Sequence, residues 1–278
     1  SPIMRASFFV LPAIVTAIAC LAAGCESPTQ TDTTILGVQN PEPRGDEALT
    51  MLLSRHVSPS GAVDYEGLSH DRPLLAGYLE HLERLDLDAK SRNERLATML
   101  NAYNAFTLAL MLENPGVESI RDISSEERWK ATRWNLGGET LSLDELEHDR
   151  IREDFDEPNI HFALVCAADS CPPLRQEAYT GAELEDQLES QARRVHASDK
   201  WFEYDPSANT VRLTKLYEWY MDDFAEAGQD GDRAVLEHAA KYDPALRRAL
   251  DSGRDPDIEW IEYDWSLNTK NSKGWTSP

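Results

Sequence analysis

Histidine and cysteine side chains concentrate in one short stretch of the chain, residues 160–174, which reads IHFALVCAADSCPPL. The stretch contains His161, Cys166 and Cys171. An imidazole can act as a general base and a thiolate as a nucleophile, so this is the part of the sequence best equipped for chemistry. The apolar run 160–165 predicts a buried strand, and the two prolines that follow Cys171 prevent regular structure. We therefore expect a strand that ends at Cys166 and a tight loop that carries Cys171.

A thiol-dependent hydrolase or acyltransferase is one function that these residues could support. A cysteine nucleophile needs an imidazole to accept its proton and a third polar group to orient that imidazole. The nucleophile would be Cys171 or Cys166, and the base would be His161 or His148. On an extended strand His161 and Cys166 would point to opposite faces, so Cys171 is the better partner for His161. The orienting group would come from the remaining polar candidates, which are Asn101, Asn104 and Glu147.

A non-catalytic or binding module is the alternative function, and the sequence favours it. In an oxidising compartment Cys166 and Cys171 are close enough to form a disulfide that staples the loop. Cysteine hydrolases usually carry the nucleophile at a helix amino terminus, and no long helix is predicted between Cys171 and Thr180. A metal site built from His161, His148 and the two cysteines would not follow a known zinc spacing. No metal and no cofactor is therefore predicted.

The amino terminus predicts export and lipidation. Residues 8–23 are almost wholly apolar and follow a basic residue, as in a signal peptide. Residues 21–25, LAAGC, resemble a bacterial lipobox, in which the cysteine is lipidated and becomes the mature amino terminus. We expect residues 1–24 to be the signal peptide and residues 25–45 to hold the lipidated Cys25 and a flexible polar tether. The protein would then be anchored in the bacterial cell envelope, on the extracytoplasmic side, with the membrane as its partner.

The amino-acid composition limits the classes of partner that the protein can bind. The chain has 27 basic and 50 acidic residues, which gives a formal net charge of −23. Such a surface repels phosphate backbones, so nucleic acid is excluded as a partner. The identity of any protein or small-molecule partner stays open. A hydrophobic content of 41% in 278 residues is ample for a packed core.

The elements that must position the candidate residues are mostly helices. Apolar residues on nearly every side of residues 94–113 predict a buried central helix, with Asn101 and Asn104 on one face. A buried amide without partners costs about 1–3 kcal/mol, so both amides are expected to be hydrogen-bonded. A capping box then predicts a helix over residues 143–152. This helix carries Glu147-His148, two neighbours that cannot share a helical face.

Weaker patterns predict the rest of the fold. Helices are predicted at residues 46–54, 72–85, 180–195, 215–227 and 233–241, hairpins at 134–141 and 202–213, and a last strand at 258–265. Trp219, Trp260 and Trp265 are expected in the core. No change of composition divides residues 46–268, so residues 46–278 are predicted to form a single α+β domain with helices packed on a small, mainly antiparallel sheet.

Five segments together resemble one family, the domain of unknown function 547 family. They are Asn101-Ala-Tyr-Asn104, 119–123, 141–148, 161–174 and 263–268, and they occur in the family's order over about residues 90–268. The family has no agreed reaction, so the resemblance implies membership of a family but no catalytic activity or substrate. Its members are often envelope proteins of bacteria, which agrees with the predicted leader.

Overall fold

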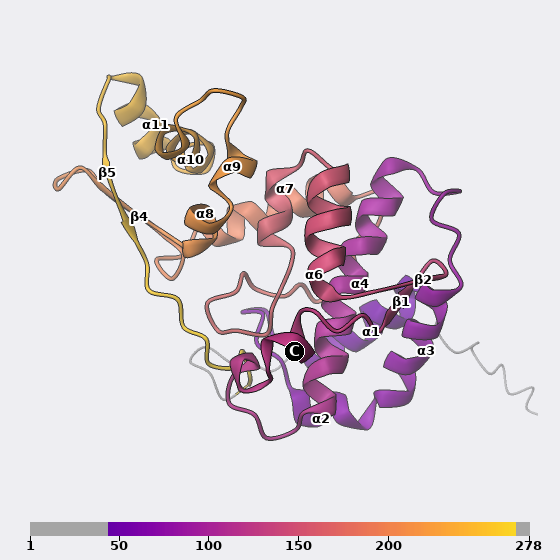
Figure 1. Ribbon diagram of the computed structural model, residues 1–278. Coiled ribbons are helices and arrows are strands. Elements are labelled where there is room, and N and C mark those ends of the chain that lie inside the picture. Colours follow the sequence, from indigo (N-terminus) through magenta and orange to yellow (C-terminus); the bar gives the residue numbers. More distant parts are fainter. Residues whose placement is uncertain (1–43, 271–278) are drawn as a thin grey trace, which may run out of the picture. The chain divides into compact units, whose positions relative to one another are not determined.

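The central helix α4, Arg92–Glu113, organises the larger of two hydrophobic cores (Figure 1). The computed structural model describes residues 44–270, which fall within one compact unit. Every residue of α4 from Leu96 to Leu112 is buried, as the apolar sequence predicts. Ser91 caps the amino terminus of α4 and Glu94 binds back to Ser91, so the helix begins at a complete capping box.

Three helices and one hairpin pack around α4 in this core. They are α1 (Asp46–His56), α2 (Tyr65–His70), α3 (Arg72–Glu83) and the antiparallel hairpin of β1 (Trp134–Leu136) and β2 (Glu139–Leu141). Gly137 and Gly138 form the hairpin turn, each with a positive φ that glycine adopts readily. A short 3₁₀ turn, η1 (Ile120–Asp122), and α5 (Ser125–Arg128) lie between α4 and β1 in the sequence.

The helix that follows the hairpin is wider than a regular α-helix. Ser142 and Glu145 form the predicted capping box, and the helix begins at Leu143 as expected. After one turn of α-helix, α6 (Leu143–Glu145), the chain continues as a π-helix, η2 (Leu146–Arg152). Such π segments occur often at functional sites. The π-helix carries both Glu147 and His148.

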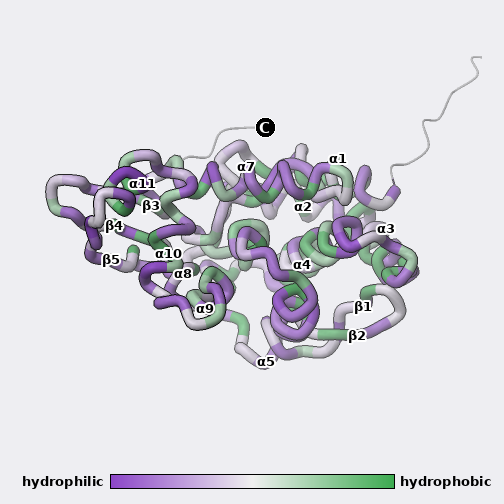
Figure 2. Tube along the Cα trace, turned by 90° about the horizontal axis from the view of Figure 1, so that it is seen from above, coloured by the Kyte–Doolittle hydropathy of each residue, from purple (hydrophilic) through white to green (hydrophobic). Residues whose placement is uncertain are grey.

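A second, smaller core forms around a three-stranded sheet. Strands β3 (Phe202–Asp205) and β4 (Thr210–Leu213) pair antiparallel, while β5 (Asp257–Trp260) pairs parallel with β4. The helices of this part are α8 (Lys215–Trp219), α9 (Met221–Phe224), α10 (Gly231–Ala239) and α11 (Pro244–Asp251). Helix α7 (Leu184–His196), which carries hydrophilic and hydrophobic residues along its length in Figure 2, contributes residues to both cores. The α+β fold class is confirmed, with two small sheets in place of one.

The predicted strand at residues 160–165 is wrong. This segment instead forms a 3₁₀ helix, η3 (Pro158–Phe162), followed by a turn. Ile160 belongs to the larger core and Phe162 to the smaller one, so successive side chains are buried on different sides. An apolar run indicates that a segment is buried on all sides. A segment that lies between two cores is buried in this way whether or not it forms a strand.

Three smaller predictions also need correction. Helix α7 begins at Leu184, because Thr180 donates its backbone N–H to Gln187 and does not cap a helix. The helix predicted over 215–227 is divided into α8 and α9 at Tyr220. The last strand ends at Trp260, because the chain beyond it turns toward the larger core.

The predicted signal peptide, Cys25 and nearly all of the predicted tether lie outside the described residues. Within residues 44–270, no helix combines the length and the apolar composition needed to cross a membrane.

Candidate functional site

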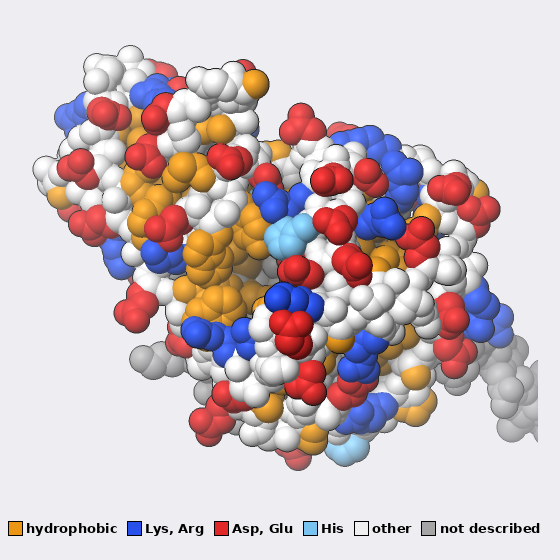
Figure 3. Space-filling model, in the orientation of Figure 1, with side chains coloured by type: hydrophobic (Ala, Val, Ile, Leu, Met, Phe, Trp, Pro, Cys, Tyr) orange, Lys and Arg blue, Asp and Glu red, His pale blue; other side chains and the backbone are white. Residues whose placement is uncertain are grey.

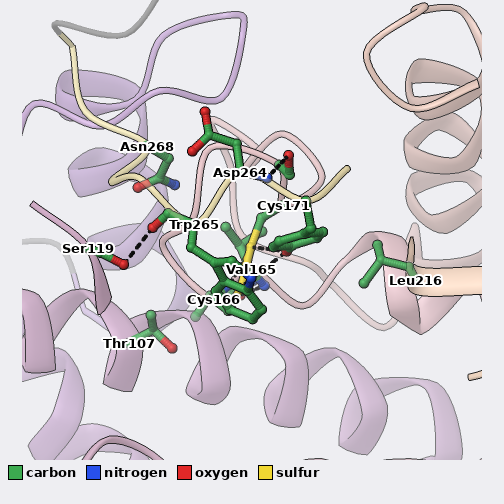
Figure 4. The surroundings of a disulfide bond; sticks show 12 residues. Thr107, Ser119, Val165, Cys166, Cys171, Leu216, Asp264, Trp265 and Asn268 are labelled. Carbon is green, nitrogen blue, oxygen red and sulfur yellow. Dashed lines mark hydrogen bonds between the residues drawn. A yellow bond between two sulfur atoms is a disulfide. The ribbon is translucent and has the colours of Figure 1, made fainter. Parts of the chain in front are cut away.

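A disulfide joins Cys166 and Cys171 and closes the loop between them (Figure 4). Their Cα atoms are 6.3 Å apart, and the backbone N–H of Cys166 points at the sulfur of Cys171, 3.1 Å away. The hydroxyl of Tyr263 lies 3.4 Å from one sulfur and 3.2 Å from the other. The loop is therefore stapled, and in this oxidised state neither cysteine is a nucleophile.

The two asparagines of α4 hold distant backbone segments. Asn104 donates to the carbonyl of Ala163 at 3.0 Å and accepts from the N–H of Val165 at 2.9 Å. Asn101 makes the same pair of bonds with the backbone of Tyr179, both at 2.8 Å. The expectation that both amides are buried and hydrogen-bonded is confirmed. Asn104 thereby fixes the chain immediately before the disulfide.

The carboxyl-terminal segment covers the stapled loop from outside. The N–H of Asn268 donates to the carbonyl of Ala167, and the N–H of Asp169 donates to the carbonyl of Ser266. Ala167 has a φ of 62°, a left-handed conformation that is unfavourable for a residue with a Cβ. The disulfide on one side and the strand-like segment on the other impose this conformation on Ala167.

A cavity of about 190 Å³ lies at the boundary of the two cores, beside the disulfide. In Figure 3 hydrophobic side chains gather in a hollow between α8 and α6. We call this cavity the aromatic pocket, because indole and phenol rings form much of its wall. It is lined by Tyr103, Trp129, Leu143, Asp144, Glu147, His148, His161, Leu164, Cys166, Cys171, Pro172, Leu216, Trp219, Tyr220, Tyr263 and Trp265.

An aspartate orients one of the two histidines in the pocket wall. His161 is 2% exposed, and its Nε2 lies 2.7 Å from Oδ2 of Asp223. Its ring stacks on that of Tyr220, with the centroids 3.9 Å apart. Because Asp223 accepts the proton on Nε2, the neutral ring has Nδ1 as its basic atom. Burial lowers the pKa of His161, although Asp223 acts in the opposite direction.

The same aspartate binds an arginine that reaches the second histidine. Arg152 donates to both carboxylate oxygens of Asp223, at 2.6 and 2.8 Å. Burial raises the pKa of Asp223, but the hydrogen bonds from His161 and Arg152 outweigh burial and hold that pKa well below its usual value. Arg152 also lies 2.9 Å from Nδ1 of His148. Since arginine only donates, Nδ1 of His148 accepts, and this histidine is neutral when that bond is formed.

Glu147 is a nearly buried carboxylate among tyrosines. It is 8% exposed and accepts a hydrogen bond from the hydroxyl of Tyr220. Burial raises the pKa of Tyr103, Tyr220 and Tyr263, and the charge of Glu147 raises all three further. Among the ion pairs of the described residues, none involves Glu147. Its hydrogen-bond donor is the phenol of Tyr220, and the charge of Arg152 interacts with it without forming an ion pair.

The structure brings five of the seven candidate residues to one pocket. Those five are Cys166, Cys171, His161, His148 and Glu147. The expected opposition of His161 and Cys166 across a strand does not occur, because no strand forms there. Asn101 and Asn104 are not among the lining residues and bind backbone instead. No hydrogen bond among the described residues joins His161 to either sulfur.

Several residues of the site were not identified from the sequence. Asp223 lies far along the chain from its partner His161, and no local pattern connects them. Trp219 and Trp265 were expected in the core, but both line the pocket, and Trp219 is 45% exposed. Tyr103 and Tyr263 had a signal that could have been used. Each lies inside a segment that carries the family resemblance.

A second cavity, of about 380 Å³, shares Cys171 and Pro172 with the aromatic pocket. It is larger, but it contains none of the histidines, tyrosines or glutamates described above. We therefore regard the aromatic pocket as the functional site. Within the described residues, no group of three or more His, Cys, Asp or Glu side chains is arranged to hold a metal ion.

Comparison with known proteins finds a partial match to one family, and that family's description names no activity. Residues 87–194 match the family described as "Protein of unknown function, DUF547". This match supports the family that the five sequence segments predicted. No curated protein and no solved structure matches the chain.

Proposed function

Starting from the match to the DUF547 family, we propose that this protein is a bacterial envelope lipoprotein that binds a small organic molecule in the aromatic pocket. The observation that carries the binding role is the pocket wall itself. Ligand sites are typically concave and mostly apolar, with a few polar groups that fix the orientation of the ligand. Here rings of Trp and Tyr surround Glu147 and the two histidines. The envelope location rests on the apolar leader and on the lipobox-like residues 21–25.

The disulfide supports a binding role in an oxidising compartment. With Cys166 and Cys171 joined, the loop that forms one side of the pocket has few conformations. A preorganised wall loses less conformational entropy when a ligand binds. The staple therefore favours affinity, and it removes the thiols that catalysis would need.

Ligand-induced thermal stabilisation of the full chain in detergent tests the binding role. A ligand that binds the folded state raises the free energy of unfolding by RT ln(1 + [L]/Kd), about 2.7 kcal/mol at a hundredfold excess over Kd. A library of neutral, anionic and cationic small molecules should contain stabilising compounds. Trp219→Ala should abolish their effect, because Trp219 lines the pocket.

Trp260→Ala is the matched control, because Trp260 lies on β5 and does not line the pocket. The stabilising compounds should act on this variant as on the wild type. A library without any stabilising compound, or compounds that act equally on both variants, would contradict a ligand site at the aromatic pocket.

A thiol-dependent hydrolase or acyltransferase is the second candidate, and one observation favours it. Asp223 and His161 form an oriented pair in the same wall as the two sulfurs. After reduction, Nδ1 of His161 would be the atom that accepts a thiol proton. Reduced protein should then hydrolyse an activated aryl ester, and Cys171→Ser or His161→Gln should abolish this activity. Equal hydrolysis by oxidised protein or by either variant would exclude the thiol mechanism.

A further inference from the structure

The charged side chains that line the aromatic pocket are acidic. The lining includes two carboxyl side chains, those of Asp144 and Glu147, and neither Lys nor Arg. Of the two histidines, His161 is buried with a lowered pKa and His148 accepts from Arg152. The interior of the pocket is therefore negative.

The nearest arginine is already committed elsewhere. The charge of Arg152 interacts with that of Glu147, but both of the parallel hydrogen bonds of Arg152 go to Asp223. Glu147 is left as a nearly buried carboxylate that forms no ion pair among the described residues. Burying an unpaired charge is costly, and a cation that enters the pocket would offset that cost.

The aromatic rings offer a second source of attraction for a cation. The faces of Trp and Tyr rings carry partial negative charge, and they attract ammonium groups. Trp219, Tyr263 and Trp265 form one cluster, with centroid distances of 4.8 Å between the first two and 4.7 Å between the last two. Arg121 lies over the ring of Trp265. In the described part of the chain no Lys or Arg lies over Trp219 or Tyr263.

We propose that the aromatic pocket binds an organic cation of the quaternary or methylated ammonium class, held between the rings of Trp219 and Tyr263 and the carboxylate of Glu147. This inference rests on the proposed binding function and specifies its ligand. A cavity of about 190 Å³ matches one small headgroup in size. The cation could be a free metabolite or the headgroup of a phosphocholine lipid, and the two share the chemistry that the pocket recognises.

Choline and 3,3-dimethylbutan-1-ol form a matched pair of probes, because they have the same shape and differ in charge. Titration of the full chain in detergent, followed by tryptophan fluorescence and calorimetry, should give a dissociation constant for choline at least about tenfold below that for the neutral alcohol. Glu147→Gln should reduce this difference to the part that the aromatic rings supply, so it should weaken choline binding more than binding of the alcohol. Trp219→Ala, at an exposed position, should weaken choline binding even if Glu147→Gln fails to fold, and Trp260→Ala should not.

Phosphatidylcholine and phosphatidylglycerol vesicles distinguish the sources of the cation. Binding of the chain to the former that choline displaces would identify a lipid headgroup, whereas choline binding without it would identify a free cation. Equal affinity for choline and the alcohol would overturn the cation class while leaving a ligand pocket in place. Failure of both probes to bind would also overturn it, and the library screen then decides whether the binding function itself survives.

Discussion

Replacing Asn104 by leucine tests the link between the central helix and the stapled loop. Leucine branches at the same carbon as asparagine and has the same number of heavy atoms, so the substitution leaves no cavity. It removes the hydrogen bonds and adds some volume, because two methyl groups are larger than the amide O and NH2. Two buried backbone groups would lose their partner, the carbonyl of Ala163 and the N–H of Val165. Each unpaired buried group costs about 1–3 kcal/mol, so for two groups we expect a loss of about 2–6 kcal/mol in the free energy of unfolding.

Urea unfolding at pH 7, followed by circular dichroism, measures this loss. With a slope of about 2–3 kcal/mol per molar urea, the midpoint should fall by about 0.7–3 M. Asn93→Leu is the control on the same helix. The Asn93 amide makes a solvent-exposed bond of 3.3 Å to Glu185, so its loss should change the stability by less than about 0.5 kcal/mol.

An Asn104→Leu midpoint within about 0.2 M of the wild type would contradict this prediction. That outcome would mean that the loop before Cys166 finds other partners, or water, for its backbone groups. A large loss in the Asn93 control would be equally damaging, because it would show that leucine on α4 destabilises the protein for reasons unrelated to the loop.

Burial lowers the pKa of His196 to about 4 and that of His238 to about 3, whereas the unfolded chain binds these protons near pH 6.5. Stability should therefore fall as the pH drops from about 6.5 to 4, by a few kcal/mol, and unfolding midpoints that do not change over this range would contradict the assignment. Reduction of the Cys166–Cys171 disulfide should lower the free energy of unfolding by about 2 kcal/mol, as measured by urea unfolding with and without dithiothreitol; equal midpoints would show that the staple adds no stability. Cys25→Ala should leave an unprocessed precursor or release soluble protein on cell fractionation, and a variant processed and fractionated like the wild type would rule out lipidation.

The helices and the hairpin whose sequence patterns lie within the element itself were predictable from the sequence. The central helix is apolar on all sides, and the hairpin at 134–141 has its Gly-Gly turn. The capping box at Ser142 placed the next helix start correctly. In each case the signal and the structure it specifies lie within a few residues of each other, so no knowledge of distant contacts was needed.

The segment that contains His161 and the two cysteines was the least predictable part of the chain. Residues 160–165 are apolar because they lie between two cores, and a sequence does not show how many cores surround a segment. The partner of His161 had the same difficulty. Asp223 reaches it only because the chain breaks between α8 and α9 at Tyr220, whose ring also stacks on His161.

Glu147 and His148 both line the pocket, although they are neighbours in the sequence and were not expected to share a face of the helix. In an α-helix successive side chains point about 100° apart, and this spacing argued against a shared face. The wider π turn of η2 brings successive side chains closer in direction, and the cavity is broad enough to meet both. Glu147 then lies among the tyrosines, while His148 lies near Asp144 and Arg152 at the edge. The two neighbours thus have different roles, since the carboxylate supplies the charge inside the pocket and the histidine connects its rim to the Asp223 network.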